Sequence, residues 1–122
     1  MAEFVYLNVN PDEMTVSDCV TRAIKLATGL PYPEVRKKLF HTSRLLNCDK
    51  LCPACYANLL DDIFKFPRIN CKGYTVGEFA DTHPHGTYIL RIPSHLTTII
   101  DGKLYDIWDC RKDWCDIAWK VE

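Results

Sequence analysis

The chain has 122 residues, 48% of them hydrophobic and 25% charged, with a net charge of −1 at pH 7. This length suits one domain that buries a core without disulfide staples, and the composition is that of an ordinary globular protein. The near-neutral charge excludes any electrostatic argument for nucleic acid or an anionic membrane as a partner. Because no apolar run could span a bilayer and the first residues do not resemble a signal peptide, we expect a cytoplasmic location.

Seven cysteines are many for a chain of this size, and their number is odd. Without a secretion signal, a disulfide framework is not expected. Free thiols, a metal site or a catalytic thiol are the interpretations that remain. At the start of the chain, Phe4 and Tyr6 indicate a short leading strand or extended arm that Pro11 ends.

The segment before Gly29 predicts the first helix, because apolar residues recur at helical spacing and glycine is a natural stop. A capping box of Thr15 and Asp18, or Ser17 as an alternative cap, would place Cys19 in the first turn. Unpaired backbone N–H groups and the helix dipole favour a thiolate there. The alternative is a small, buried, structural cysteine.

Two further helices are expected in the middle of the chain. Pro33 can open one helix, since proline is favoured in the first turn. Its predicted buried side consists of Val35, Leu39 and Phe40. A second helix is expected to begin near Pro53 and to carry its apolar residues inward, namely Tyr56, Leu59, Leu60, Ile63 and Phe64.

Cysteines between these two helices form a CxxxCxxC motif from Cys48, Cys52 and Cys55, to which Cys71 could add a fourth ligand. Four thiolates at short spacing suit tetrahedral zinc, so a structural zinc site is one interpretation. The other is three thiols on a turn that leads into a helix. The spacing also resembles the cluster-binding loop of radical SAM enzymes, although nothing else here indicates the large barrel of such enzymes.

The second half of the chain predicts a short helix capped by Thr75 and Glu78, then strands. Asp101-Gly102 between apolar, β-branched runs is a strong hairpin signal. A tight two-residue turn would place Thr97 opposite Asp106 and His95 opposite Trp108, all on one face. Asp106 would then be the diagonal neighbour of His95. A last strand beside the hairpin is expected from the alternation of Ile117, Trp119 and Val121.

The segments SDCVTRAIKLATG, GTYILRIPSHLTTIIDG and KLYDIWD place a cysteine at a helix start, a histidine on a strand and an acid on the next strand. This layout resembles the papain-like cysteine peptidases, most of all their compact bacterial and phage versions. The resemblance implies an α+β fold with N-terminal helices packed on a C-terminal antiparallel sheet. It also implies one domain over residues 1–122, with a cysteine-containing helical insertion at about 41–74.

Carried onto this chain, the resemblance implies Cys19 as nucleophile, His95 as base and then acid, and Asp106 as the group that orients the imidazole. The substrate would be a peptide or protein, and no cofactor would be required; the structural zinc considered for the middle cysteines is compatible with this activity. The backbone N–H of Cys19 would form part of the oxyanion hole. Family members usually supply the other donor from a glutamine, and this chain has none. The remaining candidates for the oxyanion hole and the cleft wall are Asn8, Asn10, Ser17 and Trp108.

Two alternatives to a thiol amide hydrolase stay open. The fold could be kept by a catalytically degenerate binding or inhibitory protein, which the missing glutamine favours. The chain could instead be a zinc-stabilised interaction module built on the four middle cysteines.

Overall fold

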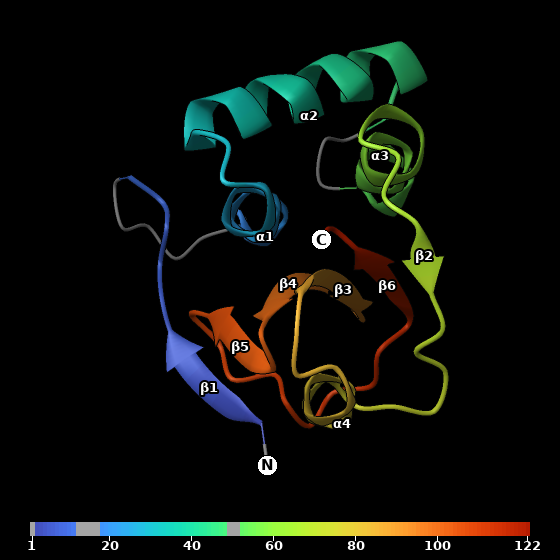
Figure 1. Ribbon diagram of the computed structural model, residues 1–122. Helices are drawn as coiled ribbons and strands as arrows, with labels where there is room; N and C mark the ends of the chain where they lie inside the picture. Colours follow the sequence, from blue (N-terminus) through green and yellow to red (C-terminus); the bar gives the residue numbers. More distant parts are fainter. Residues whose placement is uncertain (1, 12–17, 49–51) are drawn as a thin grey trace.

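The computed structural model describes residues 2–11, 18–48 and 52–122. The chain is an α+β fold, as predicted, in which helices cover both faces of a mixed sheet (Figure 1). The helices are α1 (Cys19–Thr28), α2 (Tyr32–Leu46), α3 (Pro53–Asn58), continued by a π-helical turn at Leu59–Ile63, and α4 (Val76–Thr82). The strands are β1 (Glu3–Tyr6), β2 (Arg68–Ile69), β3 (Thr87–Ile92), β4 (His95–Ile100), β5 (Lys103–Asp106) and β6 (Ile117–Lys120).

The sheet has the strand order β1-β5-β4-β3-β6-β2. The pairs β5–β4, β4–β3, β3–β6 and β6–β2 are antiparallel. Strand β1 pairs parallel with β5, with Glu3 opposite Lys103. The prediction of an antiparallel sheet confined to the C-terminal half is therefore wrong at its edges, because β1 and β2 come from earlier in the chain. Parallel pairing needs a long crossover connection, and the segment containing α1 to α4 supplies it.

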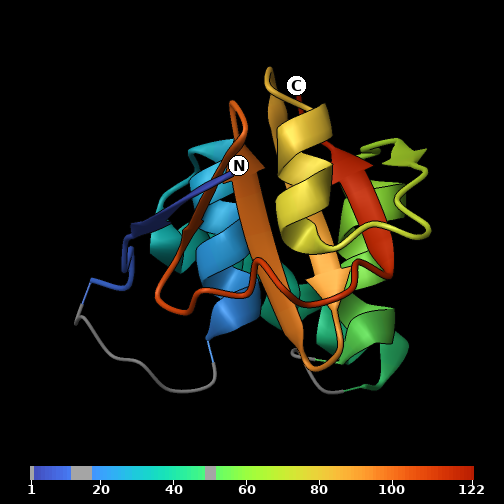
Figure 2. The same ribbon diagram turned by 90° about the horizontal axis from the view of Figure 1, so that it is seen from below.

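The two faces of the sheet bury different cores. Helices α1, α2 and α3 lie on one face and α4 lies across the other (Figures 1 and 2). On the first face, Ile89, Leu96 and Trp119 of the sheet pack against the three helices. On the second face, Leu90 and Ile99 belong to the core that includes Phe79 of α4. Neighbouring strand residues thus enter opposite cores, as the pleat requires.

Helix α1 begins at Cys19 and ends before Gly29, whose φ of +76° is the left-handed conformation expected of a C-terminal glycine. The predicted position of Cys19 in the first turn is confirmed. Asp18 is the N-cap residue, but its side chain makes no capping hydrogen bond. Thr15 and Ser17, the other predicted capping residues, lie outside the described residues.

The middle of the chain shares the core of α1. Leu59 and Leu60 are buried beside the residues of α1 and α2, and α2 continues past residue 41 to Leu46. The segment predicted as an insertion at about 41–74 therefore begins inside a helix and contributes to the central packing. Two predictions of burial are wrong: Phe40 is 55% exposed and Ile63 is 54% exposed.

The predicted two-residue turn is confirmed, and the register is confirmed over the three pairs nearest to it; β5 ends at Asp106, so Trp108 lies beyond the strand and not on the ladder opposite His95. Asp101 and Gly102 both have positive φ, 49° and 77°, as a type I′ turn requires. The pairs Ile100↔Lys103, Ile99↔Leu104 and Thr98↔Tyr105 follow from that turn. The predicted capping box of the helix that follows residue 75 is also present. Strand β6 exists as expected but pairs with β3, one strand away from the β4–β5 hairpin.

Among the described residues, every helix is too short or too polar to cross a membrane.

Candidate active site

Three elements bring the predicted site residues to one end of the sheet. Cys19 is the first residue of α1, His95 is the first residue of β4, and Asp106 is the last residue of β5. Because β4 and β5 are antiparallel, the start of one and the end of the other lie side by side. The structure therefore places the nucleophile, base and acid candidates together.

The imidazole and the carboxylate make a direct hydrogen bond. His95 Nε2 lies 2.6 Å from Asp106 Oδ2, and both side chains are over 90% buried. Thr97 Oγ1 donates to the same oxygen at 2.6 Å, and the backbone N–H of Ile107 donates to Asp106 Oδ1 at 2.7 Å. Since Nε2 is bound to Asp106, Nδ1 is the ring nitrogen left to serve Cys19.

These contacts set the charge of the pair. Burial raises the pKa of Asp106, but the hydrogen bonds from His95 and Thr97 outweigh it, so the pKa is lowered overall. Burial lowers the pKa of His95, but hydrogen bonds with Asp106 and Cys19 and their negative charges raise it to about 9. The imidazole is therefore held in its protonated form at neutral pH.

The pKa of the Cys19 thiol is shifted in the opposite direction from that of His95. Burial raises its pKa, but a hydrogen bond with His95, another with the backbone of Leu96, and the positive charges of His95 and Arg22 lower it overall. The lowered pKa of Cys19 and the raised pKa of His95 both favour transfer of the thiol proton to the imidazole, which would give a thiolate–imidazolium pair. Such a thiolate is an activated nucleophile.

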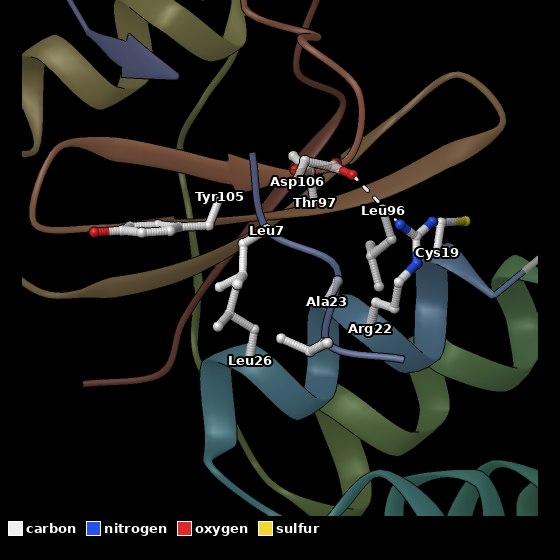
Figure 3. A pocket seen from close by; sticks show the side chains of 10 residues that line it. Leu7, Cys19, Arg22, Ala23, Leu26, Leu96, Thr97, Tyr105 and Asp106 are labelled. Carbon is white, nitrogen blue, oxygen red and sulfur yellow. Dashed lines mark hydrogen bonds and ion pairs between the residues drawn. The ribbon is translucent and has the colours of Figure 1, made fainter. Parts of the chain in front are cut away.

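A buried network of charged groups extends from Asp106 into α1. Arg22 Nη1 lies 3.9 Å from Asp106 Oδ1 (Figure 3). The Nε of Arg22 lies 2.8 Å from Asp18 Oδ1. Asp18 Oδ2 also accepts from Asn10 Nδ2 at 2.7 Å and from the Tyr32 hydroxyl at 2.9 Å. Arg22 thus lies between two buried carboxylates, one of which orients the imidazole.

An open cleft of about 400 Å³ adjoins the thiol and the imidazole. Its walls come from the start of α1, the start of α3, β3 and the β3–β4 turn. The lining residues are Cys19, Val20, Pro53, Tyr56, Arg91, Ser94 and His95. A smaller cavity of about 10 Å³, shown in Figure 3, lies between α1 and β5, where Leu7 and Leu26 face each other.

The residues predicted to donate hydrogen bonds in the oxyanion hole differ in their positions relative to the cleft. Asn10 does not line the cleft, and its amide donates to Asp18 and to Tyr32 at 3.1 Å, so its prediction as an oxyanion donor is corrected. Ser17 lies outside the described residues. Asn8 does not line the cleft either, so the backbone N–H of Cys19, at the helix N-terminus, is the predicted donor that remains among the described residues.

Trp108 packs edge-on against His95, with ring centroids 4.7 Å apart, and is 47% exposed. It covers the imidazole from solvent without lining the cleft itself. The predicted proximity of Trp108 and His95 is therefore confirmed.

The four cysteines proposed as zinc ligands do not come together. Cys71 lies in the core beneath α4, whereas Cys48, Cys52 and Cys55 pack on the opposite face of the sheet. The prediction that these four cysteines form one site is therefore wrong, because the sheet lies between Cys71 and the other three. In the part of the chain that the structure describes, all seven cysteines are free thiols.

One other group of metal-binding types exists among the described residues. His95, Asp106 and Cys110 have ligand atoms within 4.8 Å of one another. Burial and the nearby charge of Asp106 raise the pKa of Cys110 to about 12, so its thiol stays protonated. The 2.6 Å hydrogen bond already joins the other two groups, so this cluster suits a proton-bound pair better than a metal ion.

Sequence reasoning missed Arg22 and the role of Thr97. The spacing of Asp18 and Arg22, four residues apart on one helix, indicates an ion pair, and both flank Cys19. The ladder predicted that Thr97 shares a face with His95 and Asp106, and the hydrogen bond from its hydroxyl to Asp106 could have been inferred from that position.

Comparison of the chain with protein-family models, with curated proteins and with solved structures finds no match.

Proposed function

We propose that this protein is a cysteine peptidase or a related thiol amide hydrolase that uses Cys19, His95 and Asp106 in a papain-like arrangement. The observation that carries the proposal is the 2.6 Å bond between His95 Nε2 and Asp106, on an imidazole that also hydrogen-bonds the Cys19 thiol. A cysteine at a helix N-terminus with an oriented imidazole is the constellation of an activated thiol nucleophile.

In the proposed reaction the Cys19 thiolate attacks the carbonyl carbon of the scissile amide. The protonated His95 gives its proton to the leaving amine, and the acyl group remains on sulfur as a thioester. Neutral His95 then takes a proton from water, which attacks the thioester and releases the acid and the thiol. Asp106 accepts from Nε2 throughout and fixes the orientation of the ring.

The negative oxygen that develops on the carbonyl needs hydrogen-bond donors. The backbone N–H of Cys19 is well placed, because the first N–H groups of a helix have no intrahelical partner. The positive end of the helix dipole supports the same charge.

The second candidate is a protein that keeps this cleft for binding without turnover. The commitment of Asn10 to Asp18 and Tyr32 favours it, because that amide cannot replace the absent glutamine. The two candidates differ in whether the bound carbonyl is hydrolysed.

The test is the rate of Cys19 alkylation by iodoacetamide against pH, followed by mass spectrometry, in the wild type and in His95→Ala. We expect an apparent pKa below the ordinary 9.0 in the wild type and a return toward that value in the variant. The half-buried Cys48 and Cys52 are internal controls, and His85→Ala, which changes an exposed histidine, is the matched control. An inert Cys19, or a pKa that ignores residue 95, would refute the proposal.

Turnover is tested by incubating the protein and its Cys19→Ser variant with a library of short fluorogenic peptide amides. Cleavage that requires Cys19 supports the hydrolase. An activated thiol that never releases product would instead support the binding protein.

A further inference from the structure

Arg91 lies on the face of the sheet that packs against α1, α2 and α3, among mostly apolar neighbours. It occupies β3 opposite Leu96 of β4, and two residues from Ile89, both of which belong to the core beneath the helices. Near the end of β3 this core opens into the cleft beside Cys19, and Arg91 lines that cleft together with Tyr56. An arginine at such a position brings a positive charge to an apolar wall.

The guanidinium has no ion pair with any residue that the structure describes. Asp116 is the acidic neighbour of Ile117, the residue that pairs with Arg91 on β6. Its backbone N–H donates to the Arg91 carbonyl at 2.8 Å, but its side chain is exposed and makes no ion pair with the guanidinium. By contrast, the buried Arg22 and the more exposed Arg68 and Arg111 each pair with a carboxylate.

We propose that Arg91 binds a carboxylate group of the substrate. This inference rests on the proposed function and names the substrate class: a peptide with an acidic side chain or a free C-terminal carboxylate near the scissile bond. Guanidinium is the side chain that matches a carboxylate with two parallel hydrogen bonds.

The rest of the cleft fits such a group. Val20, Pro53 and Tyr56 give apolar walls, which exclude water from one side of the ion pair and strengthen it. Ser94, in the β3–β4 turn, adds a hydroxyl to the lining and can donate to a second carboxylate oxygen. A neutral substrate would leave the guanidinium with water as its partner.

The first experiment compares two alkylating reagents of nearly equal size, iodoacetate and iodoacetamide, in their rates of reaction with Cys19. The rate ratio reports the preference of the cleft for an anion, and differences in thiolate content cancel because both reagents attack the same sulfur. The variants are Arg91→Gln, which removes the charge, and Arg91→Lys, which keeps it. The charge of His95 is present in all three proteins.

We expect the iodoacetate/iodoacetamide ratio to fall roughly two- to fivefold in Arg91→Gln, the effect of losing a half-exposed ion pair, and to be largely kept in Arg91→Lys. A ratio that is the same in all three proteins, with Cys19 still activated, would overturn the carboxylate site and leave the proposed function intact. A Cys19 that is inert toward both reagents would overturn both.

The second experiment distinguishes the two sources of carboxylate. Three blocked peptides compete with iodoacetamide for Cys19: acetyl-Ala-Glu-Ala-amide, acetyl-Ala-Ala-Ala with a free C-terminus, and acetyl-Ala-Ala-Ala-amide. Stronger protection by the first indicates an acidic side chain, and stronger protection by the second indicates a terminal carboxylate, in each case only if Arg91→Gln removes the difference. Equal protection by all three peptides would contradict the proposal.

Discussion

Thr97 is the residue whose contribution to the site can be separated most cleanly from packing. Its hydroxyl is 2.6 Å from Asp106 Oδ2, and the residue is 1% exposed. Valine has nearly the same shape, so Thr97→Val removes the hydrogen bond without opening a cavity. A hydrogen bond to a charged group contributes about 1.5–3 kcal/mol, and at this chain length that loss lowers Tm by roughly 5–15 °C.

The next residue supplies a matched control. Thr98 is fully buried on the same strand, and its hydroxyl donates at 2.8 Å to the carbonyl of Ala23, a neutral acceptor. Thr98→Val should therefore cost less, about 0.5–1.5 kcal/mol. Both free energies of unfolding would be measured by urea denaturation at pH 7.

A double-mutant cycle with Asp106→Asn measures how much of the Thr97 contribution depends on the negative charge of Asp106. Thr97→Val should cost clearly less once residue 106 is neutral, which gives a coupling energy on the order of 1 kcal/mol, whereas Thr98→Val should cost the same in both backgrounds. If Thr97 and Thr98 cost the same at pH 7, or if neither couples to residue 106, Asp106 is not the buried charged acceptor that the site requires.

Three further predictions concern the charges of the site. The pKa of His95 is raised to about 9, so protonated His95 should stabilise the fold fully below its ordinary pKa of 6.5, and this stabilisation should be lost as the pH rises through 9. Midpoints of urea denaturation between pH 6 and 10 should show this decline in the wild type and not in His95→Ala. The control variant is His85→Ala, which should decline like the wild type. Asp106→Asn removes the charge that favours the imidazolium, so the alkylation pKa of Cys19 should rise, and an unchanged profile would contradict the role of the carboxylate. Arg22→Met leaves the buried Asp18 without its cation and removes the more distant of the two positive charges beside Asp106. This change should cost about 3–5 kcal/mol in thermal melts and raise the pKa of Cys19; a well-folded variant with an unchanged Cys19 pKa would show that Arg22 has no part in the site.

The parts of the fold that could be predicted from the sequence are those fixed by local geometry. The type I′ turn at Asp101-Gly102 sets the register of β4 and β5, and that register alone brings Asp106 beside His95. Cys19 at the start of α1 follows from helical spacing and the stop at Gly29. These inferences needed no knowledge of distant contacts.

The parts that failed depend on which elements meet in space. The parallel pairing of β1 with β5 joins residues about one hundred positions apart, and nothing near Glu3 specifies its partner. The separation of Cys71 from Cys55 follows from which face of the sheet each segment crosses, which spacing along the chain cannot reveal. Phe40 directly follows the fully buried Leu39 on α2, and the helix turns its side chain toward solvent.

The charges at the site favour one proton distribution over the other. Buried ion groups such as Asp18, Arg22 and Asp106 are costly, and apolar residues of similar size would often give a more stable core. Moving a proton from Cys19 to His95 leaves the net charge of this cluster unchanged. It places the new positive charge 2.6 Å from Asp106 and the new negative charge at the N-terminus of α1, near Arg22. Formation of the thiolate therefore offsets a further part of the cost of burying these charges, in addition to the contacts that Arg22 and Thr97 already make.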